Sequence, residues 1–440
     1  MSELLQRLVA TVVGPQHVST AAADLADYAP AGTPPPGDVV VWPASAGEIA
    51  QVLEVAKGNG AALLAVRRGT RRRAVGSTRP GSAPRPARPT VLVDQRRMTS
   101  VLHLDETSLV AHAQAGITGR ALEEVLGRRG LTLGYFPLEA FALPLGALLA
   151  RRRPELAAAR VGPIHGACLG VSAVLADGLV VHSRVAPRHA AGPDLLQLLL
   201  GCEGGLGIIT AAVLRVRRIP ESRTLSAFAY PTVPGALEAG VECLRRGARL
   251  AALRVYDAAD AARCLGDGGA EGPDVPAAGA LLVCCCAGPT ELAAAEARVL
   301  ADAAKAFGGS DVGAAPAEHW WRRRTDSEEG PAAKDPDALV LPAPLPALAP
   351  LHAAVVSAST AAHARCRVSI ARLHRGGGCV LVTLEGDKRS RERAHDRILE
   401  AAATIVGEPC DPLREATAAL RAVLDPGDIM SPGSLAVAPC

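Results

Sequence analysis

The sequence predicts an α+β protein of two or three domains, and three patterns lead to this fold class. Strand-like and helix-like segments alternate between residues 38 and 66, and they alternate again after Pro220. Between these stretches, a glycine-rich turn separates a leucine-rich run from a run of β-branched residues at 193–216. A chain of 440 residues, 49% of them hydrophobic, can fill the cores of that many domains.

The first alternating stretch follows Asp38 and reads VVVWPASAGEIAQVLEVAKGNGAALLAV. Its valines predict a strand, and the apolar spacing that follows predicts an amphipathic helix capped by Ser45. Glycines stop the helix before a second strand.

Three short strands are expected next, at Thr90–Asp94, Val101–Leu104 and Leu109–Ala115. The segment 116–119 then leads into a helix at Arg120–Arg129, which Gly130 ends. Residues 78–89 are rich in Pro, Arg and Ser, and they predict an exposed loop.

The turn within PDLLQLLLGCEGGLGIIT carries the clearest chemical signal. The leucine run ends at Gly201, residues 203–207 cannot continue a helix, and Ile208–Val216 reads as a strand. Glycines let backbone N–H groups approach a ligand closely, which suits phosphates and flat rings.

The second alternating stretch predicts strands at LSAFAY and LAALRVYD, a helix at 233–246, and a further strand and helix within 280–307. Residues 330–350 are rich in Pro and Ala and predict a linker or surface excursion. A helix at Leu413–Leu424 and a turn cluster are expected near the end.

Composition excludes several classes of protein. The net charge of +3 requires neither nucleic acid nor a membrane surface, and 2% aromatic residues leave few rings for stacking on bases. No apolar run reaches the length of a membrane span, and the first residues lack a secretion signal. The eleven cysteines lack metal-ligand spacing, and adjacent Cys284, Cys285 and Cys286 predict buried structural thiols. Reduced thiols fit a cytoplasmic protein.

The segment GCEGGLGIIT closely resembles the GSEGTLGIIT type of segment in FAD-linked oxidases, the vanillyl-alcohol oxidase superfamily. WPASAGEIAQVLEVAKGNG and LDPGDIMSPG resemble that family's opening and closing segments, and AHAQAGITGRALE and AALRVYD resemble its alkyldihydroxyacetonephosphate synthases. The resemblance implies a two-part FAD-binding domain of the p-cresol methylhydroxylase (PCMH) type at 35–220 and an α+β cap at 221–410. An N-terminal segment at 1–34 precedes them, and 411–440 returns to the FAD domain.

The same resemblance implies which residues contact FAD. The phosphate-cradling loop matches 65–71, where Arg67 and Arg68 replace two glycines, so its backbone should be reshaped. Arg67, Arg68 and 71–73 either recruit phosphate by charge or form a solvated basic loop. The remaining contacts implied are Gly69, Thr70, Gly116, Ile117, Thr118, Pro137, Gly146, Glu203, Gly204, Gly205, Leu206, Gly207, Ile208 and Ile209.

Catalytic residues match the family less well. The acid–base tyrosine and histidine run of the synthases fall at 379–382 and 404–410, which contain neither residue. Arg254 matches the cap arginine and could hold a substrate phosphate or form an ion pair with Asp257. His374, His182 and His189 are the remaining acid–base candidates. Trp320 and Trp321 either line a substrate channel or pack beneath a loop.

Two functions remain open from the sequence. One is an FAD-dependent oxidoreductase or alkylglycerone-phosphate synthase acting on a small molecule or lipid phosphate. The other is a catalytically degenerate homologue that serves as a binding or partner subunit. A homodimer is among the expected assemblies.

Overall fold

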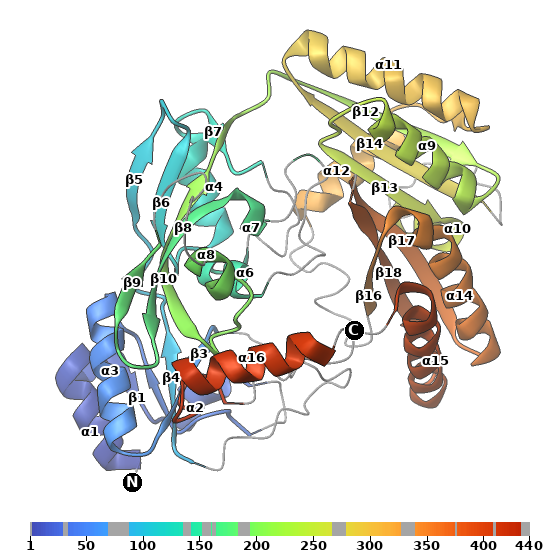
Figure 1. Cartoon of the computed structure of the whole chain (residues 1–440). Coiled ribbons are helices and arrows are strands. Elements are labelled where there is room, and N and C mark those ends of the chain that lie inside the picture. Colours follow the sequence, from blue (N-terminus) through green and yellow to red (C-terminus); the bar gives the residue numbers. More distant parts are fainter. Residues whose placement is uncertain are drawn as a thin grey trace.

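The computed structural model describes residues 2–29, 34–68, 88–134, 142–151, 160, 164–183, 194–265, 279–326, 339–374, 376–407 and 411–432. It is an α+β fold, which confirms the predicted class. Figure 1 shows an N-terminal half that contains two sheets and a second half built on one large sheet.

The first sheet has the strand order β1-β2-β4-β3. These strands are β1 (Val18–Ser19), β2 (Val39–Val41), β4 (Thr90–Asp94) and β3 (Ala62–Val66). Both β2 and β3 run parallel to β4. The helical elements around this sheet are α1 (Ser2–Val13), η1 (Pro15–His17), α2 (Ala22–Ala26) and α3 (Ala46–Gly58). The predicted helix cap is confirmed, because the Ser45 side chain accepts a hydrogen bond from the Glu48 N–H.

The second sheet is antiparallel, with the order β5-β6-β10-β8-β9. Its strands are β5 (Val101–Asp105), β6 (Val110–Gln114), β10 (Gly207–Arg215), β8 (Cys168–Leu175) and β9 (Val180–His182). The helices nearby are α4 (Gly119–Gly127), α6 (Leu145–Ala150), α7 (Ile164–Ala167) and α8 (Leu195–Leu199). Leucines of α4, α6 and α8 share a buried core with β6 and β10, so the predicted helix–turn–strand order at 193–216 is confirmed.

A short ribbon leads out of the N-terminal half. In it, β7 (Leu131–Thr132) pairs with β11 (Arg217–Arg218). Strand β12 (Ser222–Tyr230) follows and belongs to the large sheet, so β11 stands at the junction of the two halves.

The large sheet, called the cap sheet below, has the order β15-β12-β14-β13-β17-β18-β16. The strands besides β12 are β13 (Ala252–Asp257), β14 (Ala280–Gly288), β15 (Ser310–Asp311), β16 (Leu339–Ala343), β17 (Arg365–His374) and β18 (Gly377–Glu385). Its helices are α9 (Val233–Arg245), α10 (Ala258–Leu265), α11 (Thr290–Ala306), α12 (Ala315–Asp326), α14 (Leu348–Ala361) and α15 (Lys388–Val406), with η4 (Leu345–Ala347) before α14.

The two faces of the cap sheet differ in what covers them. Leu253 and Val255 of β13 share a core with residues of α9, α11, α14 and α15. Tyr256 faces the other way, together with Trp320 of α12. Figure 1 shows α9, α11, α14 and α15 on the side away from the N-terminal half, so the face of Tyr256, called the inner face below, looks toward that half.

The prediction of a linker at 330–350 was wrong within the described residues. Leu339–Ala343 forms edge strand β16, which pairs with β18, and helical turns begin at Leu345. Proline obscured this strand in the sequence, but an edge strand tolerates Pro342 because one side of its backbone has no ladder to form.

The prediction of buried thiols is confirmed. Cys284, Cys285 and Cys286 lie in β14 and are at most 1% exposed. Cys284 and Cys286 belong to the core beneath the outer helices, whereas Cys285 packs on the inner face. Adjacent strand residues therefore direct these sulfur atoms to opposite sides.

Candidate cofactor site

Three parallel strands of the first sheet end at the same edge. Trp42 follows β2, Arg67 and Arg68 follow β3, and Asp94 ends β4 ahead of Arg96. Ligands of open sheets with parallel strands bind beside the carboxyl ends of those strands. This carboxyl edge is therefore the natural place for a cofactor.

The predicted segment 116–118 lies at this edge and is held by the chain after β4. The Gly116 N–H donates to the Met98 carbonyl at 2.9 Å. A Cβ on Gly116 would stand 1.9 Å from the Gln95 carbonyl oxygen, so only glycine fits there. The Thr118 side chain caps α4 by accepting a hydrogen bond from the Ala121 N–H.

Gly146 lies beside the same segment. Its N–H donates to the Ala115 carbonyl at 2.8 Å, and the Leu145 N–H donates to the Ile117 carbonyl at 2.8 Å. The Gln95 side chain in turn donates to the Ile209 carbonyl at 2.9 Å. Hydrogen bonds of the backbone and of the Gln95 side chain thus hold three predicted segments, at 116–118, 146 and 203–209, near one another.

The glycine-rich turn wraps around one of its own side chains. The Cys202 side chain is buried within the turn, and its thiol donates a hydrogen bond to the Gly207 carbonyl at 3.6 Å. Burial raises the pKa of the Cys202 thiol, so it remains protonated. Glu203 has a φ of 49° and Gly204 a φ of 80°, so the turn combines two left-handed residues. The Gly205 N–H donates to the Cys202 carbonyl at 2.7 Å, so part of the donor capacity expected for a ligand serves the turn itself.

The chain beyond α16 (Asp411–Leu424) lies along β3. The Leu63 N–H donates to the Ile429 carbonyl at 2.8 Å, and the Ser431 N–H donates to the Leu63 carbonyl at 2.7 Å. The buried Asp425 carboxylate fixes this turn by accepting hydrogen bonds from the N–H groups of Ile429 and Met430. A Cβ on Gly204 would meet both Ser431 and Ala65, so the C-terminal turn borders the site.

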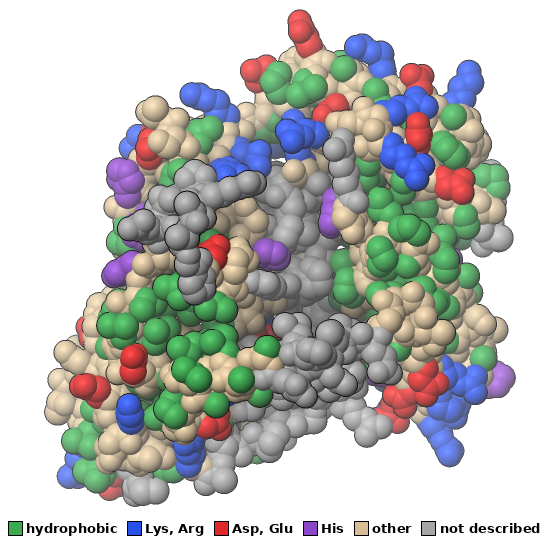
Figure 2. Space-filling model, viewed as in Figure 1, with side chains coloured by type: hydrophobic (Ala, Val, Ile, Leu, Met, Phe, Trp, Pro, Cys, Tyr) green, Lys and Arg blue, Asp and Glu red, His purple; other side chains and the backbone are tan. Residues whose placement is uncertain are grey.

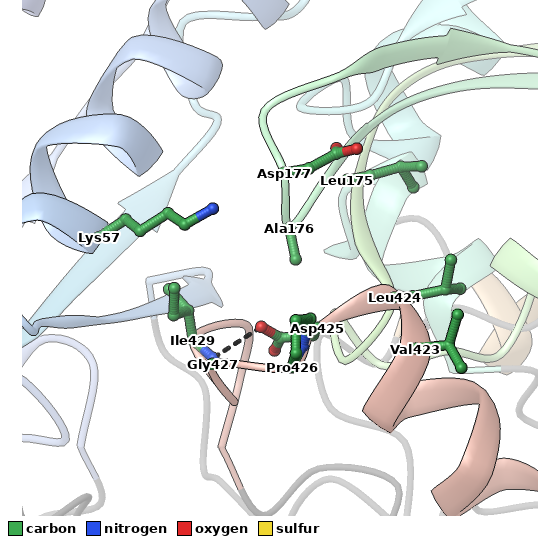
Figure 3. A pocket seen from close by; sticks show the side chains of 10 residues that line it. All are labelled: Lys57, Leu175, Ala176, Asp177, Val423, Leu424, Asp425, Pro426, Gly427 and Ile429. Carbon is green, nitrogen blue, oxygen red and sulfur yellow. Dashed lines mark hydrogen bonds between the residues drawn. The ribbon is translucent and has the colours of Figure 1, made fainter.

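A pocket of about 210 Å³ lies beneath this turn (Figure 3). It is bounded by Lys57, Asp177 and the residues from 423 to 429. Lys57 ends α3 just before β3 begins, so the pocket lies at the amino edge of the sheet. It is therefore separate from the predicted cofactor segments.

A buried polar cluster at the carboxyl edge was missed in the sequence. The Tyr28 hydroxyl donates to the Asp94 carboxylate at 2.7 Å and accepts from Trp42 Nε1 at 3.1 Å. The Arg96 guanidinium pairs with Asp94 and lies over the Trp42 ring, with its central carbon 5.2 Å from the ring centroid. Burial raises the pKa of Tyr28. These residues come from three separate segments, and no motif links them.

The two catalytic candidates lie in the cap sheet. Arg254 of β13 is half-buried on the inner face, with its guanidinium carbon 5.9 Å from the Trp320 ring centroid. His374 ends β17 and is exposed, and its Nδ1 accepts a hydrogen bond from the Gly376 N–H at 2.9 Å. The atoms packed around its ring still displace part of the surrounding water, which lowers the pKa of His374. Asp257 accepts hydrogen bonds from the N–H groups of Asp260 and Val368.

Some predicted residues lie outside the described part of the chain, namely Gly69, Thr70, Pro137, His189 and 71–73. Of the two arginines that replace loop glycines, Arg68 is exposed and pairs with Asp27 at 2.8 Å. His182 is exposed, and its Nδ1 lies 2.8 Å from Ser172 Oγ in the neighbouring strand β8, away from the carboxyl edge.

Comparison with protein families gives two matches in sequence. A model of the FAD binding domain matches residues 36–184, and a model of the C-terminal domain of FAD linked oxidases matches residues 219–408. The chain belongs to the FAD-linked oxidase family. FAD is accordingly its cofactor, and the two matched regions are called the FAD-binding domain and the cap from here on.

Curated relatives of this FAD-linked oxidase match part of its length. The alkyldihydroxyacetonephosphate synthase of Caenorhabditis elegans is 29% identical over 225 residues, or 50% of this chain and 36% of the synthase. An uncharacterized FAD-linked oxidoreductase of Escherichia coli is 30% identical over 171 residues, or 39% of this chain and 35% of that protein. The match to the worm synthase therefore spans about a third of that protein.

Solved structures show the fold. An alkyldihydroxyacetonephosphate synthase superposes with a TM-score of 0.72 at 21% identity, covering 90% of this chain and 77% of its own. p-Cresol methylhydroxylase superposes with a TM-score of 0.76 at 14% identity, covering 99% of this chain and 97% of its own. The predicted PCMH-type fold is confirmed.

The residues at the carboxyl edge suit FAD. Arg67 and Arg68 follow β3, and Arg96 follows β4, so guanidinium groups of the kind that bind phosphate stand at this edge, two of them paired with Asp27 and Asp94. Gly116 and Gly146 let the backbone of their segments pack closely against Gln95 and Ala115 at the same edge. Within the described part of the chain, no helix is long and apolar enough to cross a membrane.

Proposed function

We propose that this FAD-linked oxidase is an enzyme that acts on a small anionic substrate held between the FAD-binding domain and the inner face of the cap sheet. The position of Arg254 carries the proposal. It lies on the face that looks toward the FAD-binding domain, and Figure 2 shows that the molecule is hollowed between its two halves. An arginine there offers a fixed fork of donors to a carboxylate or phosphate.

Packing supports a binding role for Arg254. The Trp320 ring supports one side of the guanidinium, which limits its freedom before a substrate arrives. Asp257 follows Arg254 by three residues, so the alternation of side chains along a strand places it on the opposite face. Its carboxylate accepts hydrogen bonds from the N–H groups of Asp260 and Val368. These contacts favour the substrate role over an ion pair with Asp257.

His374 is the proposed hydrogen-bond donor to the reacting group of the substrate. Because Nδ1 accepts from the Gly376 N–H, the neutral ring carries its hydrogen on Nε2 and donates from there. In the ladder, Arg254 is paired with Ala371, three residues before His374 in β17. The two side chains thus belong to adjacent strands. FAD, when bound, supplies the electron-pair chemistry, while Arg254 orients the substrate and His374 donates to a developing negative charge.

The first test is the visible absorption spectrum of purified protein before and after addition of FAD and desalting. Retained flavin bands support the enzyme. Turnover would then be tried with an acyl-dihydroxyacetonephosphate and with D-lactate. Arg254→Gln should lower kcat/KM by about 100-fold, because a charged group in the substrate loses its partner.

Arg7→Gln, an exposed change on α1, is the matched control and should leave turnover unchanged. A colourless protein that takes up no FAD would overturn the enzyme proposal and would favour the catalytically degenerate alternative. Flavin that is retained while Arg254→Gln has full turnover would remove Arg254 from the site but leave the cofactor in place.

A further inference from the structure

Four arginines meet where the FAD-binding domain joins the cap. Arg215 ends β10 and Arg217 lies in β11, whereas Arg160 precedes α7 and Arg249 precedes β13. Arg217 is half-buried and lies within electrostatic reach of the other three. The pKa of Arg217 is lowered, mainly by burial and further by the positive charges of Arg160, Arg215 and Arg249.

Hydrogen bonds place Arg160 and the segment after Arg249 at one end of β14. The Arg160 guanidinium donates to the Ala287 carbonyl, and its Nη1 would lie 3.3 Å from a Cβ on Gly288. The Ala251 N–H donates to the Cys285 carbonyl at 2.7 Å, which brings the segment after Arg249 beside the same strand. Arg217 pairs with Thr132 in the short ribbon below.

The cluster has no acidic partner within the described part of the chain. None of the four arginines forms an ion pair there, although other arginines of this protein do, such as Arg96 with Asp94 and Arg246 with Glu242. Buried Glu296 accepts a hydrogen bond from the Arg249 backbone N–H through Oε1. Four like charges that remain together without a counter-charge repel one another, and a bound anion relieves that repulsion.

We propose that Arg160, Arg215, Arg217 and Arg249 form a binding site for a phosphate-bearing ligand that bridges the FAD-binding domain and the cap. Arginine forks match phosphate oxygens, and a doubly charged group can engage several of them at once. Two exposed large apolar residues border this site: Ile219, two residues after Arg217, is 44% exposed, and Leu292 is 43% exposed. The Leu292 side chain lies 3.9 Å from the Cβ position of Gly288, beside Arg160.

The ligand therefore joins a phosphate to an apolar portion, and a soluble phosphate ester or a phospholipid headgroup has this chemistry. The site differs from the proposed substrate position along β14, because Arg160 contacts Ala287, whereas Arg254 is paired with Val283, four residues earlier in that strand.

Thermal unfolding and calorimetric titration of the purified protein, saturated with FAD, test the site with pyrophosphate as the probe. Sodium chloride at equal ionic strength is the blank. Pyrophosphate should raise the unfolding temperature of the wild type. The double variant Arg217→Ala/Arg249→Ala should bind pyrophosphate at least tenfold more weakly, and the matched variant Arg7→Ala should bind like wild type.

If the four arginines served only to hold the fold together, the double variant would be less stable than wild type. The proposal predicts instead that, without added anion, the double variant is at least as stable as wild type, because two repelling charges are gone. A double variant that is destabilised without anion and retains the full pyrophosphate shift would overturn the proposal. The measured quantity is the unfolding temperature, so this test of the anion site remains valid even if the protein fails to turn over any substrate.

Vesicle flotation separates the two ligand sources. Binding to phosphatidic acid vesicles but not to phosphatidylcholine vesicles, lost in the double variant, would support a lipid headgroup. Pyrophosphate binding without vesicle binding would support a soluble phosphate ester. Binding of neither probe would refute the site.

Discussion

Gly204 and Ser431 lie against each other although they are 227 positions apart in the sequence. A Cβ on Gly204 would stand 2.7 Å from Ser431 Oγ, and it would lie 3.6 Å from the Ala65 Cβ. The glycine-rich turn, the C-terminal turn and strand β3 therefore meet at one point. The backbone of Gly204 is also left-handed, with a φ of 80°.

Gly204→Ala should destabilise the protein by about 3 kcal/mol, because a left-handed backbone and a crowded Cβ both act against it. Gly60→Ala is the matched control, since Gly60 has a φ of 62° and no atom within 4 Å of its Cβ position. The control should lose only about 1 kcal/mol. Urea unfolding measures both, and equal losses would show that the contact with Ser431 has no energetic weight.

The Tyr28 hydroxyl links Asp94 and Trp42, whereas the hydroxyl of Tyr230 is buried without a hydrogen-bond partner in the described chain. Tyr28→Phe should therefore cost about 1–3 kcal/mol, because the Asp94 carboxylate loses a donor. Tyr230→Phe should change stability by less than about 0.5 kcal/mol or raise it. Chemical denaturation of the two variants side by side tests this difference, and a larger loss for Tyr230→Phe would contradict it.

Local patterns predicted much of the fold. Ser45, Thr118 and the glycines after each helix specify their turns through contacts with near neighbours, so the sequence reveals them. The same holds for strands β2 to β6, β10 and β12 to β14. In contrast, strand β16 was not predicted, because Pro342 argues against a strand. Proline is compatible with an edge strand, but the sequence does not show that this segment lies at the edge of the sheet.

The site was predictable only where it follows a motif. Residues 116–118 and 203–209 were found because their glycines stand in a family pattern, and the structure brings both segments to one edge. The Tyr28 cluster and the four junction arginines were not found, since each assembles residues from distant segments by tertiary packing. The enclosure of Cys202 by its own turn is likewise a three-dimensional fact that spacing does not reveal.

Gly116→Ala should be far more damaging than a typical surface change, because its Cβ would overlap the Gln95 carbonyl. Gly127→Ala in α4 is the control, since no atom lies within 4 Å of its Cβ position and alanine favours a helix. We expect Gly116→Ala to lose most soluble yield or more than about 3 kcal/mol of stability, and Gly127→Ala to behave like wild type. A stable Gly116→Ala protein would mean that the 95–98 segment can move aside.

Asp257 should make stability depend on pH in an unusual direction. Burial raises its pKa to about 6, against 3.8 for an unperturbed aspartate, and the neighbouring Asp260 carboxylate adds to the rise. The folded state therefore holds this proton more tightly than the unfolded state. The stabilising contribution is fully present below about pH 4 and is lost as the pH rises toward 6.

The loss across this interval is on the order of 2–3 kcal/mol, since each pH unit of difference in pKa corresponds to about 1.4 kcal/mol. Asp257→Asn should flatten the unfolding free energy between pH 4 and 6, measured by urea denaturation at several pH values. Asp387→Asn is an informative control, because hydrogen bonds from Ser390 lower the pKa of Asp387 and give it the opposite sign. Its removal should soften the loss of stability on acidification instead. An Asp257→Asn protein whose pH profile matches that of wild type would show that the Asp257 carboxyl is hydrated in solution.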